Sequence, residues 1–213
     1  MIEVSAMADV PDVARGLVRD LRVRWALEEA GLPYASRLLA GADADAPGYR
    51  AVQPFGQVPV MWDGDFVLFE SGAIVLHIGE RAEALLPRDP QARSRAVQWC
   101  FAALNSVEPH LSNLVLLDFL YAGEEWARLR RPGAEAMARR RVTQVAASLG
   151  EKSHLDGDRF TAGDLLMVSV LRIVPGLVAE HPALADYVAR CTARPAFGRA
   201  MAGQLADFDR AAA

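Results

Sequence analysis

Apolar and polar positions follow two different periods in the N-terminal part of the chain, residues 1–84. Leu17, Leu21 and Trp25 recur every four residues, which predicts an amphipathic helix over residues 16–30. A second helix, of about ten residues, is expected after Ser71. Short alternating or continuous apolar stretches predict β-strands at residues 2–6, 34–39, 60–62 and 66–69. The predicted order is strand, helix, strand, followed by strand, strand, helix.

The chain changes character after Leu85–Pro90, LLPRDP, whose two prolines predict a linker. From Gln91 onward, apolar residues recur at helical spacing and no stretch is convincing as a strand. Helices are predicted over residues 91–121 with a kink at Pro109, 124–131, 134–149, 162–174, 182–192 and 195–206. The expected organisation is an α/β domain at residues 1–84, a linker at 85–90 and an all-α domain at 91–213.

Turn and cap residues support these boundaries. Gly31 is expected to end the first helix in the left-handed conformation. Asp63-Gly64 can supply the positive φ angles of a tight hairpin turn. Ser71 is expected to be the N-cap of the helix after it, because its hydroxyl can accept a free backbone N–H. Thr161 and Asp164 have the spacing of a capping box.

The composition is typical of a soluble globular protein, with 52% hydrophobic and 23% charged residues in a chain of 213. A net charge of −4 and a pI near 5.6 argue against nucleic acid or an anionic membrane as a partner, because both need a basic patch. No apolar run reaches the roughly 18 residues of a membrane span, and the first residues lack the pattern of a signal peptide. We therefore expect a cytoplasmic protein.

The cysteines and histidines indicate no metal site. Cys100 and Cys191 lie far apart within helical patterns, which excludes a CxxC redox pair, a zinc cluster and a disulfide framework. Both are expected to be small buried side chains. The histidines have no metal-ligand spacing, and structural roles are expected for them: His77, His110, His154 and His181.

Several short motifs, taken in order, resemble the cytosolic glutathione S-transferases, of the kind found in bacteria. They are Arg22–Tyr34 (RVRWALEEAGLPY), Gln57-Val58-Pro59, the Asp63-Gly64 hairpin, Glu70-Ser71, LLPRDP and Phe160-Thr161 with Asp164. No single motif is decisive, but their order and spacing together are specific. The resemblance implies a thioredoxin-like N-terminal domain followed by an all-helical C-terminal domain.

The resemblance also implies a site for glutathione, used as a co-substrate. The Val58–Pro59 bond would be cis, and the N–H and C=O of Val58 would pair with the cysteinyl backbone of glutathione as an added strand does. The alternative is that Pro59 simply begins an edge strand.

Glu70 and Ser71 would bind the γ-glutamyl head of glutathione. Ser71, at a helix N-terminus, offers a hydroxyl and the positive end of the helix dipole to the α-carboxylate. Glu70 would pair with the ammonium group on the same carbon. Gln57 and Gln53 would reach the glycyl end or the peptide amides. The alternative is an ordinary serine cap preceded by a surface acid.

The residue that activates the thiol does not follow from the resemblance. Family members place a Tyr, Ser or Cys near the start of the first helix, where this chain has Leu17, which cannot donate a hydrogen bond. Arg15 or Arg19 is the preferred replacement, because a nearby guanidinium favours the thiolate. Both can instead be solvated surface charges. The other candidates are Ser5, Asp12 and the backbone amides of residues 16–18.

The first helix of the all-α domain is expected to line a pocket for the second substrate. Phe101, Asn105 and Glu108 recur every three or four positions and are expected to share one face. The two polar residues can equally cap the kink at Pro109. Phe55 matches a position where some family members insert an aromatic side chain into a partner subunit, and a homodimer is the family default.

Two functions stay open on the sequence. The first is an enzyme that transfers glutathione to a small electrophile, or uses glutathione to reduce, isomerise or dehalogenate one. The second is a non-catalytic binding or regulatory protein that has kept the fold, for which Leu17 is the best support.

Overall fold

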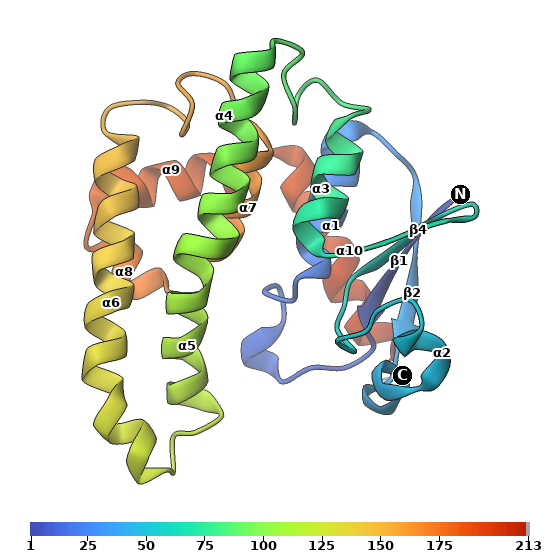
Figure 1. Cartoon of the computed structure of the whole chain (residues 1–213), viewed down its shortest axis with the longest axis horizontal. Helices are drawn as coiled ribbons and strands as arrows, with labels where there is room; N and C mark the ends of the chain where they lie inside the picture. The colour runs from blue at the N-terminus through green and yellow to red at the C-terminus, as the bar shows by residue number, and fades with distance from the viewer. Residues whose placement is uncertain (212–213) are drawn as a thin grey trace. The chain divides into compact units, whose positions relative to one another are not determined.

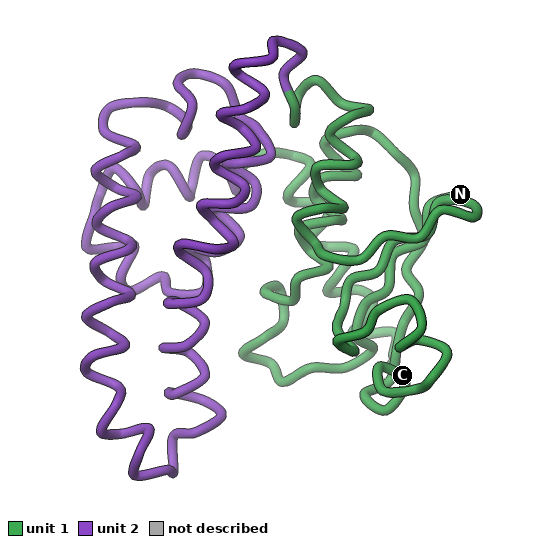
Figure 2. Tube along the Cα trace, viewed as in Figure 1, with its two compact units in different colours: residues 1–86, 193–213 green, residues 87–192 purple. Residues whose placement is uncertain are grey.

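A computed structural model describes residues 1–211 of the chain, which divide into two compact units (Figure 2). Unit 1 consists of residues 1–86 and the C-terminal residues from Ala193 onward. Unit 2 consists of Pro87–Thr192. The expected linker therefore contributes its first two residues to unit 1 and the others to unit 2.

Unit 1 is built on a mixed sheet of four strands in the order β2-β1-β3-β4 (Figure 1). The strands are β1 (Ile2–Met7), β2 (Tyr34–Leu39), β3 (Val60–Asp63) and β4 (Phe66–Phe69). β1 pairs in parallel with β2 and antiparallel with β3, which in turn pairs antiparallel with β4. All four strands predicted from the apolar pattern are confirmed, and two of them extend one residue further.

The helices of unit 1 are α1 (Asp20–Ala30), the short α2 (Pro47–Arg50), α3 (Ser71–Gly79) and α10 (Pro195–Ala211). The prediction that the first helix starts at residue 16 is wrong. Gly16 has a φ of 79°, which a right-handed helix cannot contain, and residues 15–19 form turns that lead into α1. Gly31 ends α1 with a φ of 65°, which confirms the expected cap.

Helix α10 packs against α1, so contacts assign the end of the chain to unit 1. The rings of Trp25 and Phe197 meet edge to face at 4.9 Å, and Arg194 donates two hydrogen bonds to Glu29. The all-α domain was expected to span residues 91–213, but unit 2 ends at Thr192 and the last helix belongs to unit 1. Helical periodicity identifies α10 as a helix, but it does not say which unit the apolar face meets.

Unit 2 is all-helical: α4 (Pro90–Phe101), a π-helical segment (Ala102–Val107), α5 (Glu108–Phe119), α6 (Glu125–Leu149), α7 (Ala162–Leu171), α8 (Pro175–Ala179) and α9 (Pro182–Thr192). Two predictions are wrong here. The interruption expected at Pro109 lies one turn earlier, in the π-helical segment, and Pro109 is accommodated in the first turn of α5. The separate helices expected at 124–131 and 134–149 are one helix with Pro132 inside it.

The core of unit 2 surrounds α7, which is buried along nearly its whole length. The predicted capping box at its start is confirmed: the Thr161 Oγ1 accepts from the N–H of Gly163, and the N–H of Thr161 donates to Asp164. Gly163 allows a close approach, because a Cβ there would lie 2.5 Å from Trp99. Helix α4 can therefore pack directly on α7.

Candidate functional site

The β3–β4 hairpin brings the two unusual motifs of the sequence together. Val60 pairs with Phe69. The residues that precede Val60 and follow Phe69, Val58-Pro59 and Glu70-Ser71, therefore flank the same end of the hairpin. The opposite end is the predicted tight turn, although Gly64 with a φ of 63° is its only residue at positive φ and Asp63 still belongs to β3.

Val58 has a buried side chain and an unpaired backbone. Its side chain lies in a small apolar cluster with Tyr49 and Val60, and the Val58–Pro59 peptide bond is cis. Within residues 1–211, neither the N–H nor the C=O of Val58 has a hydrogen-bond partner. Buried residues nearly always pair these groups, so this backbone offers one donor and one acceptor to a ligand.

Ser71 is the first residue of α3, and not its N-cap as expected, because Glu70 occupies the cap position. Glu70 has a φ of 71°, a conformation that is costly for a residue with a Cβ and that turns the chain from β4 into α3. Ser71 is buried, while the Glu70 side chain is exposed. A hydroxyl and the N-terminal amides of α3 thus lie next to an exposed carboxylate.

Arg22 adds a positive charge to this place, which the sequence did not reveal. Its Nη1 donates to the Ser71 Oγ over 3.3 Å, and Arg22 is buried. The sequence pattern suggested a helix with one solvated face, where an arginine has no special meaning. In the structure α1 is buried on all sides from Asp20 to Leu27, so a charged residue there must face another element.

Arg15 and Arg19, the two arginines proposed for thiol activation, lie in different surroundings. The Arg19 Nη1 donates to the Gln57 Oε1 over 3.4 Å, beside Val58. Arg15 pairs with Asp12 and with Asp209 of α10, and its guanidinium lies 5.5 Å from the centre of a phenylalanine ring of the same helix. Only Arg19 therefore contacts a residue of the Val58 loop.

Three other residues named in the sequence analysis are also placed, of which Ser5 was a candidate for thiol activation and Gln53 a candidate for glutathione binding. Leu17 is half-buried and brings no hydroxyl. Ser5 is fully buried in β1 and hydrogen-bonded to Tyr49 and Val60, so it does not offer its hydroxyl to a ligand. The Oε1 of Gln53 accepts from the backbone N–H of Phe55, which commits this side chain to its own loop.

Phe101, Asn105 and Glu108, expected on one face in unit 2, do not share it. Phe101 and Asn105 are exposed, whereas Glu108 is buried at the start of α5. The π-helical segment between them adds a residue to the turn and rotates the positions after it, so a spacing of 3.6 residues no longer aligns the three side chains. Only Phe101 and Asn105 are open to a ligand on this surface.

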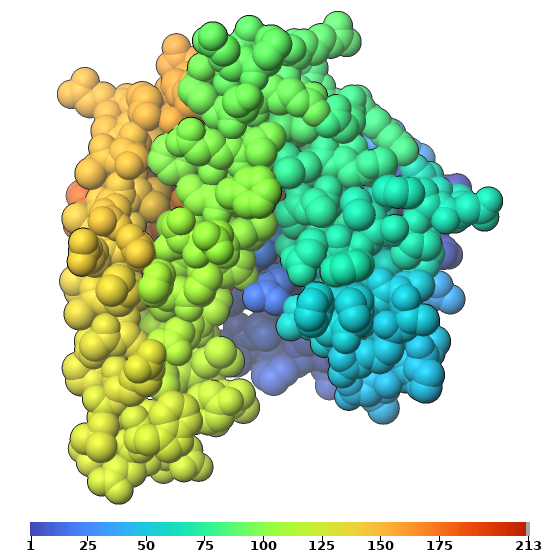
Figure 3. Space-filling model, in the orientation of Figure 1, coloured from blue at the N-terminus to red at the C-terminus, as the bar shows by residue number. Residues whose placement is uncertain are grey.

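Exposed apolar side chains gather where α5 leads into α6. They are Leu116, Phe119, Leu120, Tyr121, Trp126 and Leu129. This segment forms the yellow-green tip of unit 2 at the bottom of the space-filling view (Figure 3). Phe55 of unit 1 is likewise 62% exposed, with its ring edge-on to Phe69 at 6.2 Å.

The cysteines have structural surroundings. In the described part of the chain, Cys100 and Cys191 form no disulfide and are buried, as predicted, and burial raises the pKa of the Cys100 thiol to about 12. Since the thiolate is the nucleophile, Cys100 is inert at neutral pH. Within residues 1–211 no group of three His, Cys, Asp or Glu side chains is arranged to hold a metal ion.

Among the described helices, none has the length and apolar character needed to cross a membrane.

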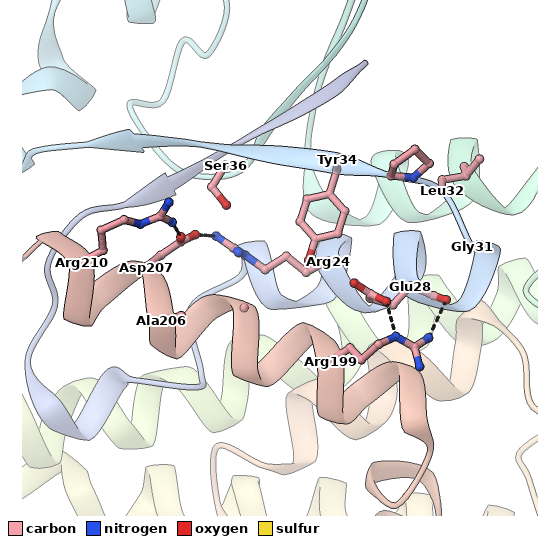
Figure 4. A pocket seen from close by; sticks show the side chains of 12 residues that line it. Arg24, Glu28, Gly31, Leu32, Tyr34, Ser36, Arg199, Ala206, Asp207 and Arg210 are labelled. Carbon is pink, nitrogen blue, oxygen red and sulfur yellow. Dashed lines mark hydrogen bonds and ion pairs between the residues drawn. The ribbon is translucent and has the colours of Figure 1, made fainter.

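Unit 1 also contains a cavity of about 760 Å³ lined by α1, β2 and α10 (Figure 4). The Arg24 Nη2 donates to Asp207 over 2.6 Å, and Arg210 pairs with the same carboxylate. At the other end of the cavity Arg199 donates to Glu28. These charges already pair with one another across the elements, so the cluster fastens α10 to α1.

The fold and the site together define a class of protein: a thioredoxin-like domain with the element order β-α-β-α-β-β-α and a cis-proline loop, joined to an all-helical part. Comparison with known proteins agrees. A family model described as "Glutathione S-transferase, N-terminal domain" matches residues 21–81. "Glutathione S-transferase 3" of Zea mays is 33% identical over 199 residues, which cover 85% of this chain and 88% of that protein.

Solved structures share the fold. A glutathione transferase family member from Pseudomonas fluorescens, with two glutathione bound, has a TM-score of 0.83 at 21% identity and covers 94% of this chain and 92% of that one. The theta class glutathione S-transferase of Xanthomonas axonopodis pv. citri, with glutathione bound, has a TM-score of 0.75 at 26% identity, with 94% and 96% covered. The chain belongs to the glutathione S-transferase family, and the predicted fold class is confirmed.

Proposed function

We propose that this protein binds glutathione at the end of the β3–β4 hairpin and uses its thiol to attack a small electrophile. The observation that supports this most directly is the unpaired backbone of the buried Val58, which lies beside the N-terminus of α3, where Ser71 accepts a hydrogen bond from Arg22 of α1. One backbone donor and one acceptor suit the cysteinyl residue of a peptide. The helix N-terminus suits a carboxylate.

The proposed contacts involve all three residues of glutathione, from the γ-glutamyl group to the glycyl end. The α-carboxylate of the γ-glutamyl group would accept from Ser71 and Arg22, while Glu70 would pair with the neighbouring ammonium group. Val58 would bind the cysteinyl backbone. Gln57 is exposed next to Val58 and would reach the glycyl end, whereas Gln53 supports the loop.

Arg19 is the residue we propose for stabilising the thiolate. It contacts Gln57, so its guanidinium lies near the loop that would hold the cysteinyl residue. A positive charge there favours the ionised sulfur over the thiol. In the reaction the thiol loses its proton to solvent, the sulfur lone pair forms the new S–C bond, and the leaving group departs with the electrons of the bond that breaks.

The electrophile, the assembly and the location belong to the same proposal. Phe101 and Asn105 would contact the electrophile. The exposed Phe55 would insert into a partner subunit of a homodimer. A cytoplasmic role in detoxification is consistent with the reduced state of Cys100 and Cys191, because the glutathione pool keeps that compartment reduced.

A non-catalytic glutathione-binding protein is the second candidate function. The observation in its favour is Leu17, which stands where family members with a hydroxyl or thiol would stabilise the sulfur. Arg19 replaces that group only if its charge reaches the thiol. The two functions share the binding site, and they differ in whether the bound thiol is ionised.

Replacement of Ser71 by alanine tests the binding site. We expect Ser71→Ala to weaken glutathione binding about ten- to a hundredfold, since a hydrogen bond to a charged group contributes ~1.5–3 kcal/mol. Isothermal titration calorimetry on folded protein measures this. Ser94→Ala is the matched control, because Ser94 is an exposed serine of α4 whose hydroxyl donates to the Pro90 carbonyl. Unchanged affinity in Ser71→Ala would remove Ser71 from the site.

A further inference from the structure

A chain of three hydrogen bonds connects the two sides of the Val58-Pro59 loop. The backbone N–H of Val60 donates to the Ser5 Oγ over 2.7 Å. The Ser5 Oγ and the Tyr49 Oη are 2.9 Å apart, and the Tyr49 hydroxyl donates to the backbone carbonyl of Gln57 over 2.7 Å. The chain thus begins at the residue after the loop and ends at the residue before it.

The direction of each hydrogen bond follows from the number of protons. The tyrosine hydroxyl has one proton, which it donates to the Gln57 carbonyl, so it must accept from Ser5. The serine hydroxyl therefore donates to Tyr49 and accepts from Val60. Burial raises the pKa of Tyr49, although the hydrogen bond with Ser5 lowers it, so the phenol stays protonated and remains a donor.

These three hydrogen bonds fix the backbone on both sides of Val58, whose own N–H and C=O are unpaired within residues 1–211. They use the carbonyl of Gln57 and the N–H of Val60, the nearest backbone groups on either side of Val58-Pro59. Val58 shares an apolar cluster with Tyr49, so its side chain is held as well. The N–H and C=O of Val58 are the groups that no described residue satisfies.

We propose that Ser5 and Tyr49 are positioning residues for glutathione, which hold the Val58 backbone in place to pair with the cysteinyl residue. This inference rests on the proposed function, since it assigns Val58 to that residue. Neither hydroxyl contacts the ligand. Ser5 is fully buried in β1, and Tyr49 belongs to α2. The loop is therefore aligned by two elements that are distant from each other in sequence.

The test compares glutathione with an analogue in which the cysteinyl N–H is replaced by an ester oxygen. The analogue cannot donate to the Val58 carbonyl, and we expect it to bind the unmodified protein about tenfold more weakly. In Tyr49→Phe this penalty should fall to about twofold, because the loop no longer holds the carbonyl in place. Glutathione itself should bind Tyr49→Phe about five- to tenfold more weakly.

Tyr187→Phe is the matched control. Tyr187 is a buried tyrosine like Tyr49 and donates through its hydroxyl, but to Asp164 in unit 2. The Tyr187→Phe variant should be less stable, but it should bind glutathione as tightly as the unmodified protein does and should still bind the ester analogue about tenfold more weakly than glutathione. Ser71→Ala should weaken both ligands equally, since it acts on the γ-glutamyl head.

Ser5→Ala provides a second variant should Tyr49→Phe fail to fold, and the same reduced ester penalty is expected for it. Amide hydrogen exchange at Val60 should also accelerate in Ser5→Ala, because its acceptor is removed. A full ester penalty in these variants would overturn the inference alone. No binding of glutathione to the unmodified protein, or no ester penalty in it, would overturn the assignment of Val58 in the proposed function as well.

Discussion

Asp164→Ala is expected to lower the free energy of unfolding by ~3–5 kcal/mol, the largest effect of any single substitution in unit 2. The carboxylate is fully buried and accepts four hydrogen bonds. Oδ1 accepts from the N–H of Leu155 and from the hydroxyl of Tyr187, and Oδ2 accepts from the N–H and the hydroxyl of Thr161. Alanine would leave these buried donors unsatisfied and remove the capping box of α7.

Urea unfolding followed by circular dichroism measures this effect. Asp118→Ala is the control, because Asp118 accepts from Arg131 between α5 and α6 on a partly exposed surface, where ion pairs contribute little. The midpoint of Asp164→Ala should shift far more than that of Asp118→Ala. Similar midpoints would show that the box is not the centre of the fold of unit 2.

Arg24→Ala is expected to destabilise unit 1 by ~3–5 kcal/mol, because it leaves the buried carboxylate of Asp20 without its countercharge, whereas Asp207 keeps Arg210. Arg24 is buried between Asp20, whose Oδ2 accepts from Nε at 2.7 Å, and Asp207, whose Oδ2 accepts from Nη2 at 2.6 Å. Gln204 also donates to Asp20, but a neutral amide cannot replace the positive charge that Arg24 provides to this carboxylate. The cluster joins α1 to α10, so its loss should free the C-terminal helix.

The dependence of this loss on pH has a definite sign. Burial raises the pKa of Asp20 in spite of the opposing effect of Arg24, so removing Arg24 raises it further. A carboxyl whose folded pKa lies above its unfolded value contributes stability below the unfolded pKa, and that stability is lost as pH rises through the folded pKa. Arg24→Ala should therefore be most impaired at neutral pH, and the deficit should shrink as the pH falls.

In the unmodified protein the pKa of Asp207 is shifted in the opposite direction from that of Asp20. Burial acts to raise the pKa of Asp207, but hydrogen bonds from Ser36 and Arg24 hold the pKa below its ordinary value. Its contribution is present above the unfolded pKa and is lost as pH falls through the folded pKa, so the native protein itself loses this part of its stability in acid.

Thermal unfolding between neutral and mildly acidic pH follows both effects. Arg37→Ala is the control, because Arg37 stacks over Trp62 at 4.8 Å on the exposed side of β2. It should change the melting temperature little, and equally at each pH. A deficit for Arg24→Ala that does not shrink with falling pH would contradict the role given to the buried carboxylates.

Features that depend on local sequence were predicted well. Strand alternation, Gly31 and the Thr161–Asp164 box act within a few residues, and the structure confirms them. The errors arise where tertiary contacts override local preference. Pro132 lies within α6, which packs against α5, and local propensity does not contain such a contact between elements.

The candidate site was predictable only in part, for the same reason. Val58-Pro59 and Glu70-Ser71 lie on one hairpin, so their adjacency follows from the register of two consecutive strands. Arg22, Ser5 and Tyr49 reach this place from α1, β1 and α2, and no local pattern relates them to it. The π-helical segment likewise displaced Glu108 from the face expected for the second substrate.

The most direct test of the account is the ultraviolet absorbance of glutathione's thiolate during titration of the unmodified protein near neutral pH. We expect saturable binding and a thiolate signal that corresponds to a thiol pKa lowered by about one unit or more, equivalent to ~1.4 kcal/mol. Arg19→Gln should lose most of this signal and Arg15→Gln should keep it. A bound thiol that stays protonated, or no saturable binding, would contradict the proposed enzyme.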